Sequence, residues 1–336
     1  MTSNTTNTNR RVATAAIALA AITAGLGFTT PASAQTASWP TKPVRFTVPA
    51  AAGTAPDVIV RVLGEKLSRM WGQQVLIDNR PGAGGVIGMV SLKGGEKDDH
   101  GFGFVQASVL TLAPYMYRST QVNVPEEFTP FALVGLSPMM LAVAANSPVN
   151  SLAELVTLAK TKPGGIVAAV PMQYSTPHLA AEMLAKVTGA PIRSIPFSNT
   201  AQTVSAVISD DAQLTVDGVP PLEGMVKGGK LKALGIFSDG RLASRPQLAA
   251  VGEGYADMVI NGWFAIVAPK GTAPKAMQRI HDDLATVVAM PDVIERLDSL
   301  GVFPKPMSQT EVAAYVGSER TRWEKVLRDL NAQPMN

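Results

Sequence analysis

Short runs of β-branched and aromatic residues alternate with longer stretches of helical period, and this alternation limits the possible folds more than any other feature. A first run at 44–48 is closed by Pro49, and the stretch 58–71 repeats its apolar residues at helical spacing before Gly72. The alternation restarts after Asn150. Strands that alternate with helices predict an α/β fold of parallel sheets with helices on both faces.

The remaining elements follow from the same two periods. We expect strands at 74–77, 102–105, 133–144 (interrupted by Pro138), 166–170, 192–195, 213–216 and 232–237, and helices at 151–160, 179–187 and 200–208. The last third is predicted to be mostly helical, with helices at 273–289, 291–299 and 309–331.

The first 34 residues are typical of an export signal. Arg10 and Arg11 precede an apolar stretch at 12–26, and the small residues at 32–34 form a cleavage site before Gln35. The apolar stretch is shorter than the ~20 residues that a membrane-spanning helix needs. We therefore predict a signal peptide over 1–34, cleavage at Ala34-Gln35 and a periplasmic mature chain. The arginine pair leaves open whether the Sec or the twin-arginine route is used.

Composition excludes several classes of protein. The signal holds two of the basic residues and no acidic one, so its removal takes the formal net charge from +3 to +1. This balance gives no electrostatic reason to expect nucleic acid or a membrane surface as a partner. The chain has no cysteine, which excludes disulfides, thiolate nucleophiles and cysteine-ligated metals. A mature chain of about 300 residues suits two domains or one large one.

Loops between strand ends and helix starts are the expected ligand-binding places in such a fold. The first of them holds Ala52, Gly53, Thr54 and Asp57, with Thr54 as a candidate helix cap. The N–H groups of a helix start attract an anion. An ordinary capped turn is the alternative, and Asp57 suits either a capping role or a ligand contact.

A glycine-rich segment at 78–88 superficially resembles a dinucleotide-binding fingerprint. Its spacing is wrong, because Gly82 and Gly84 require a third glycine at position 87, whereas the glycine lies at Gly88. Backbone approach to a ligand at Gly84, or tight packing, is the preferred interpretation.

The second half of the chain contains a comparable helix start at Tyr174, Ser175, Thr176 and His178. Ser175 or Thr176 suits the N-cap and Pro177 the first turn, which predicts a second anion-binding helix terminus. Tyr174 suits either a ligand contact or the core. His178 is interpreted as a hydrogen-bonding residue and not as a general base.

Two further strand ends complete the candidate ligand-binding residues. Ser198 and Asn199 precede the helix at 200–208, and Asp217 follows the strand at 213–216, where an ordinary turn residue is the alternative. None of the familiar catalytic motifs is present. The candidates amount to backbone donors and small hydroxyls, which predicts a receptor with no catalytic residues, metal or cofactor.

Motifs along the whole mature chain resemble the Bug family, the extracytoplasmic receptors associated with tripartite tricarboxylate transporters. The matching segments are 39–45, 49–57, 78–85, 128–130, 151–155, 159–164, 176–179, 262–264, 268–274 and 323–326.

The resemblance implies a type II periplasmic-binding-protein fold, with two α/β lobes that close on a ligand like a clamshell. The crossover strands are expected near Ala142 and near 262–267, so that 35–142 and 260–336 form one lobe and 143–259 the other. The family's ligands are typically carboxylates, held by the loops at 53–57 and 175–178. An inner-membrane permease of the tripartite tricarboxylate type is the implied partner, and we expect a monomer.

Two loops depart from the family's pattern. A usual Gly-Gly pair is replaced by Gly53-Thr54, and a usual aromatic-Lys-Gly sequence by Phe197-Ser198-Asn199. The kind of carboxylate (dicarboxylate, tricarboxylate, acidic amino acid or aromatic acid) therefore stays open. Two alternative functions also stay open: a ligand-sensing subunit for a periplasmic signalling partner, and an enzyme that uses the same cleft.

Overall fold

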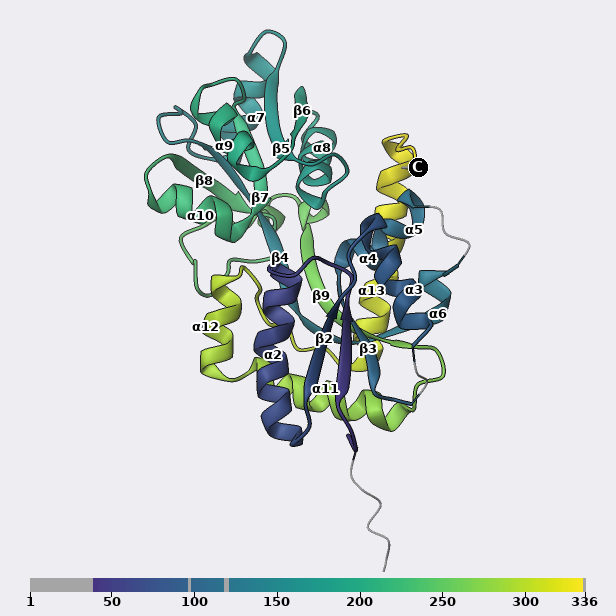
Figure 1. The fold of residues 1–336 in the computed structure, drawn as a ribbon. Coiled ribbons are helices and arrows are strands. Elements are labelled where there is room, and N and C mark those ends of the chain that lie inside the picture. The colour runs from purple at the N-terminus through teal and green to yellow at the C-terminus, as the bar shows by residue number, and fades with distance from the viewer. Residues whose placement is uncertain (1–38, 96–97, 118–120, 335–336) are drawn as a thin grey trace, which may run out of the picture. The chain divides into compact units, whose positions relative to one another are not determined.

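The computed structural model describes residues 39–334 except 96–97 and 118–120 (Figure 1). The predicted signal peptide lies outside the described residues, so that prediction stays a prediction. Among the described residues, no helix has both the length and the apolar character needed to cross a membrane.

Within the described residues, nine strands form one mixed sheet, in the order β2-β1-β3-β9-β4-β7-β5-β6, with β8 paired to β4. Their bounds are β1 Val44–Val48, β2 Val75–Asn79, β3 Gly101–Gln106, β4 Phe128–Ala144, β5 Ile166–Pro171, β6 Ile192–Phe197, β7 Leu214–Gly218, β8 Leu231–Ile236 and β9 Asn261–Pro269.

The longer helices pack against this sheet. They are α2 Ala55–Trp71, α3 Val86–Lys93, α7 Leu152–Thr161, α8 Thr176–Thr188, α9 Thr200–Ile208, α10 Val219–Lys227, α11 Pro274–Val288, α12 Pro291–Ser299 and α13 Gln309–Asp329. Short helical turns are α4 Ala107–Thr111, α5 Ala113–Met116, α6 Val124–Glu127, and the 3₁₀ segments η1 Ala83–Gly85, η2 Val251–Glu253 and η3 Ala256–Met258.

Strand β4 joins two α/β lobes. Its first part, up to Pro138, pairs with β9, and its last part, from Met139, pairs with β7 and β8. The first lobe is built on β1, β2, β3 and β9, and the second on β5 to β8 (Figure 1). The predicted lobe limits at residues 142 and 259 stay a prediction.

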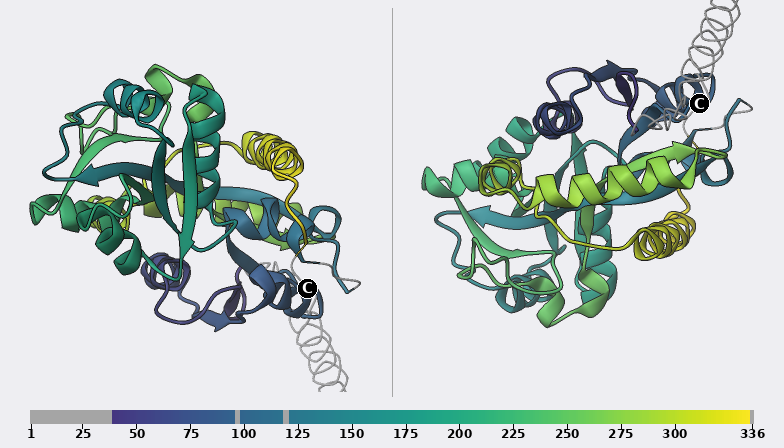
Figure 2. Two further views of the ribbon diagram at one scale, coloured as in Figure 1. Left: turned by 90° about the horizontal axis from the view of Figure 1, so that it is seen from above. Right: turned by 90° about the horizontal axis from the view of Figure 1, so that it is seen from below.

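Each lobe buries apolar side chains on both faces of its part of the sheet. In the first lobe, Phe46 and Phe102 pack with α2, α11 and α12, while Trp263 and Val267 pack with α3, α4 and α13 on the other face. In the second lobe, α7 and α8 cover one face and α9 and α10 the other. Helices α11 and α13 pack with different residues of β4, α11 with Phe131 and Val134 and α13 with Phe128 and Leu133. Figure 2 shows the fold from above and from below.

Helix α13 connects the two lobes through its two ends. Val312 and Val316 pack in the first lobe, whereas Trp323 and Leu327 pack with the core of the second lobe. Arg322 donates hydrogen bonds to the carbonyls of Val259, at 2.5 Å, and of Asp257, just before β9. The helix therefore holds the return crossover in place.

Two expectations from the sequence are wrong. The sheet is not wholly parallel, because β4 and β9 run antiparallel to their neighbours, and only β1, β2 and β3 and likewise β5, β6 and β7 are parallel. Pro138 does not interrupt β4, because it lies where the strand changes partners. In addition, β9 was expected only from the family resemblance, and α10 was not expected.

Candidate functional site

A cavity of about 560 Å³ lies where both lobes contribute residues. Ala55, Gln106 and Ser108 line it from the first lobe, and Thr176 and Asp217 from the second. Ser137, Met139 and Gly262 belong to the strands that join the lobes. This volume falls in the range of about 300–1,000 Å³ found for small-molecule sites.

The N-terminus of α2 is positioned by hydrogen bonds in the loop after β1. Asp57 is buried, accepts from the N–H of Gly53 at 2.8 Å, and accepts from Nε of Arg61 at 3.0 Å. Asn79 of β2 donates to the carbonyl of Ala50 at 3.2 Å. The bond from Arg61 is the main reason why the pKa of Asp57 is lowered. Asp57 therefore acts as a loop-positioning carboxylate in this structure.

Thr54 occupies the N-cap position of α2, but its side chain does not cap the helix. Its hydroxyl donates to the carbonyl of Ala51 at 2.6 Å, so the expected side-chain cap is wrong. No partner for the backbone N–H of Ala55 is found within the described part of the chain. Because a helix start leaves its first N–H groups unbonded, this donor is available to a ligand in the cavity.

The N-terminus of α8 is built in a similar way in the other lobe. Ser175 caps it, accepting from the N–H of His178 at 3.3 Å and donating to the carbonyl of Pro171. His178 Nδ1 accepts from the N–H of Tyr174 at 2.9 Å. Burial lowers the pKa of His178, with Glu182 partly opposing the shift, and this favours the neutral ring that the bond requires. His178 is thus a loop-positioning residue.

The two helices share one local design. In each, an extended N-cap is followed by one residue with a backbone N–H and then by proline: Thr54-Ala55-Pro56 and Ser175-Thr176-Pro177. Within the residues that the structure describes, the N–H of Thr176 has no partner. Ala55 and Thr176 both line the cavity, so each lobe supplies one N–H group and the positive end of a helix dipole.

Asp217 lines the cavity at the end of β7. Its carboxylate accepts from the hydroxyl of Thr200 at 2.5 Å and from the N–H of Gly218 at 2.7 Å. Burial raises the pKa of Asp217, although these two bonds oppose the shift. The group is therefore held firmly at the cavity wall.

The glycine-rich segment packs tightly against its surroundings. A Cβ on Gly84 would lie 2.3 Å from the ring of Tyr117, and one on Gly88 would lie 2.9 Å from the backbone of Pro49. Gly84 and Tyr117 both line the cavity. Close packing, which the sequence left as an alternative, therefore explains these glycines, and it places the tyrosine ring at the cavity wall.

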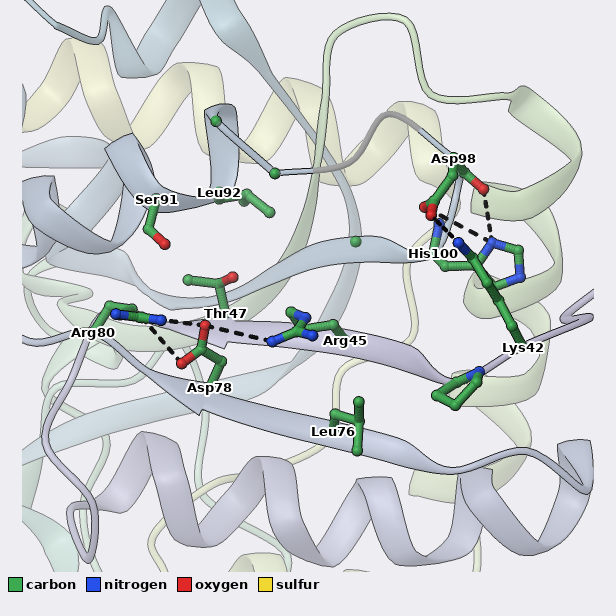
Figure 3. Close-up of a pocket in the computed structure, with 14 residues that line it drawn as sticks. Lys42, Arg45, Thr47, Leu76, Asp78, Arg80, Ser91, Leu92, Asp98 and His100 are labelled. Atoms are coloured by element: carbon green, nitrogen blue, oxygen red, sulfur yellow. Dashed lines mark hydrogen bonds and ion pairs between the residues drawn. The ribbon is translucent and has the colours of Figure 1, made fainter.

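A second, outer hollow of about 540 Å³ is lined by residues of β1 and β2, the end of α3 and the start of β3, away from the residues that line the first cavity (Figure 3). Asp78 lies between Arg45 and Arg80, with ion-pair distances of 3.9 and 3.0 Å, and Lys42 pairs with Asp98. None of the residues that we predicted to bind ligand lines this hollow. The cavity between the lobes is therefore the better candidate site.

The predicted binding residues are only partly gathered at the cavity. Gly84, Tyr174, Ser175, Thr176 and Asp217 line it. The other seven do not: Ala52, Gly53, Thr54, Asp57, His178, Ser198 and Asn199.

Two of these seven residues have local roles at the start of α9. The side chain of Asn199 caps the helix by accepting from the N–H of Gln202, and the N–H of Ser198 donates to the side-chain oxygen of Gln202. Sequence reasoning missed Gln106, Ser137, Trp263 and Phe264, which line the cavity from strand segments. Of these four, only Gln106 could have been predicted, because it follows the strand expected at 102–105 and ligand-binding residues are expected at strand ends.

Comparisons with known proteins agree with this architecture. The family model described as "Tripartite tricarboxylate transporter family receptor" matches residues 59–332. Protein BugT of Bordetella pertussis is 30% identical over 309 residues, which cover 91% of this chain and 94% of BugT.

Solved structures show the same fold. A solute-binding protein from Polaromonas, solved without ligand, has a TM-score of 0.78 and 22% identity, covering 87% of this chain and all of that one. Rpa4515 of R. palustris, solved with adipate, has a TM-score of 0.73 and 26% identity, covering 88% of this chain and all of that one.

The fold is that of a two-lobed periplasmic binding protein, and the family match identifies the class as a solute-binding receptor. The chain belongs to the tripartite tricarboxylate transporter receptor family. This match confirms the resemblance seen in the sequence. The family is one of solute-binding receptors and not of enzymes.

Proposed function

We propose that the mature chain is an extracytoplasmic receptor that captures a small carboxylate in the cavity between its lobes. The main observation in support is that two similar helix starts, one from each lobe, reach the same cavity. Ala55 and Thr176, whose backbone N–H groups begin these helices, both line it. A carboxylate has two oxygens and suits two such donors, and charge-assisted bonds to it are the stronger kind. The adipate in Rpa4515, a relative at 26% identity, supports this ligand class.

The same proposal includes export and delivery. The leader over 1–34 directs the chain to the periplasm, and the closed receptor presents its ligand to a permease of the tripartite tricarboxylate type. A ligand that contacts both lobes only when they are closed shifts the population towards the closed form. The ligand-binding set consists of Gly84, Tyr174, Ser175, Thr176 and Asp217, with Ala55 added.

A thermal-shift panel tests this proposal. The chain from Gln35 onward is heated with organic acids and with the matched amide of each acid. A bound acid at 100 times its Kd stabilises the folded state by about 2.7 kcal/mol, which raises the Tm of a chain of this length by roughly 4 °C. The amides are expected to give no shift, because they lack the negative charge. If no acid in a broad panel raises Tm, the proposed function is wrong.

A further inference from the structure

The loop at the start of α8 holds two non-glycine residues in left-handed backbone conformation. Met172 has φ 49° and Tyr174 has φ 57°. This region is unfavourable for an ordinary residue, whereas glycine adopts it freely. Hydrogen bonds keep the loop in this form: the N–H of Met172 donates to the carbonyl of Phe197 at 2.8 Å, and that of Tyr174 to His178. Strain of this kind gathers at functional sites.

Both strained residues line the cavity; Met172 is exposed, whereas Tyr174 is half-buried and also packs against the core of the second lobe. Met172 is 62% exposed, the largest value among the exposed large apolar side chains of the described residues. Tyr174 lies beside His178, with 5.8 Å between ring centroids. The loop therefore keeps a thioether and a phenol ring at the cavity wall at positions where glycine would fit without strain.

Apolar side chains from other elements line the same cavity. Met116 at the end of α5, Met139 on β4 and Phe264 on β9 contribute a thioether or a ring. Methionine side chains adapt their shape and make favourable contacts with aromatic rings. These side chains complement a flat, apolar ligand body. The two helix N–H groups together suit the two oxygens of one carboxylate.

We propose that Met172 and Tyr174 select the ligand, as an apolar clamp for a carboxylate with an aromatic body. This inference rests on the proposed receptor function and narrows its ligand class. When the ligand binds, it covers the exposed Met172 side chain. The burial of this apolar surface offsets part of the unfavourable free energy of the left-handed backbone.

Calorimetric titration of the mature chain with benzoate, malonate and citrate tests the clamp. The unaltered chain is expected to bind benzoate at least about 10-fold more tightly than either polycarboxylate, which corresponds to about 1.4 kcal/mol. The double variant Met172→Gly with Tyr174→Gly is expected to lose about 30-fold or more in benzoate affinity, while malonate affinity changes less than about 3-fold. Its Tm is expected to fall only modestly, because glycine relieves the left-handed backbone at both positions and so offsets part of the packing that Tyr174 loses against the core of the second lobe.

Asn331→Gly is the matched control. Asn331 also has a left-handed φ of 50°, is exposed and does not line the cavity, so its replacement leaves every affinity unchanged. Tyr174→Asn, which tolerates the same backbone, is a second variant in case the double variant unfolds; it is expected to weaken benzoate alone. Malonate or citrate binding as tightly as benzoate, or equal loss of both ligands in the variants, overturns the clamp but leaves the receptor function standing. Binding of no acid at all overturns the receptor function itself.

Discussion

Thr176→Pro is expected to weaken carboxylate binding by about 10- to 100-fold, because it deletes one charge-assisted hydrogen bond of roughly 1.5–3 kcal/mol. The change removes the backbone N–H that lines the cavity. The helix tolerates it, since Thr176 is the first residue of α8 and proline fits that position. Ser175, at φ −72° and ψ 161°, already has the extended backbone that a residue before proline requires.

Thr176→Ala is the control that isolates this N–H group. It removes the hydroxyl and keeps the backbone donor, so it is expected to bind within about 3-fold of the unaltered chain. The same comparison is made in the other lobe with two separate variants: Ala55→Pro removes the N–H and Ala55→Ser keeps it. Thr54, at φ −78° and ψ 165°, already has the extended backbone that a residue before proline requires. Isothermal titration with the acid that gives the largest thermal shift measures the four affinities. Equal affinities for the proline and non-proline variants would place the carboxylate away from these helices.

Arg245→Met is expected to destabilise the fold by roughly 3 kcal/mol, because it leaves two carboxylates without their buried cation. Arg245 is 6% exposed, donates twice to Glu223 of α10 at 2.9 and 2.8 Å, and donates to Asp298 of α12 at 2.8 Å. Its guanidinium also lies 5.4 Å from the ring centroid of Phe303. Since α10 belongs to the second lobe and α12 packs in the first, this network ties the lobes together.

The effect of Arg245→Met depends on pH with a definite sign. Hydrogen bonds from Arg245 lower the pKa of Glu223. Burial raises the pKa of Asp298, but bonds from Arg245 and Ser244 outweigh it, so that this pKa is also lowered. Carboxylates with lowered folded-state pKa values stabilise the fold above their unfolded values, about 4. The stability gap between the unaltered chain and the variant is therefore full at pH 7 and shrinks as the pH falls below about 4.

Urea unfolding midpoints at several pH values measure that gap. Arg279→Met is the matched control, since Arg279 pairs with Asp283 along one helix and its side chain is 43% exposed. It is expected to change stability by less than about 0.5 kcal/mol. An Arg245 variant as stable as this control would show that the network contributes little to the fold.

The helices and strands were largely predictable because their apolar periods are clear. β1 at Val44–Val48 and α12 at Pro291–Ser299 lie where the periodicity places them. The pairing of β4 was not predictable, because a buried apolar strand carries no signal for the direction of its neighbour. The direction is set by the two crossings between the lobes, which depend on residues far apart in the sequence.

The site was predictable only where it depends on local backbone chemistry. The Ser-Thr-Pro sequence predicts an N-cap at Ser175 or Thr176, and in the structure Ser175 is the N-cap of α8. Trp263 and Phe264 line the cavity from β9, where their sequence is indistinguishable from that of a core strand. The strain at Met172 and Tyr174 was also invisible in the sequence, since neither residue type indicates a left-handed backbone.

A crystal structure of the mature chain with its best-binding acid would show directly how the ligand is held. We expect a carboxylate in the cavity between the lobes, with oxygens about 2.7–3.2 Å from the backbone nitrogens of both Ala55 and Thr176. A carboxylate held instead by Arg45 and Arg80 in the outer hollow of Figure 3, or in the cavity but apart from both nitrogens, would contradict it.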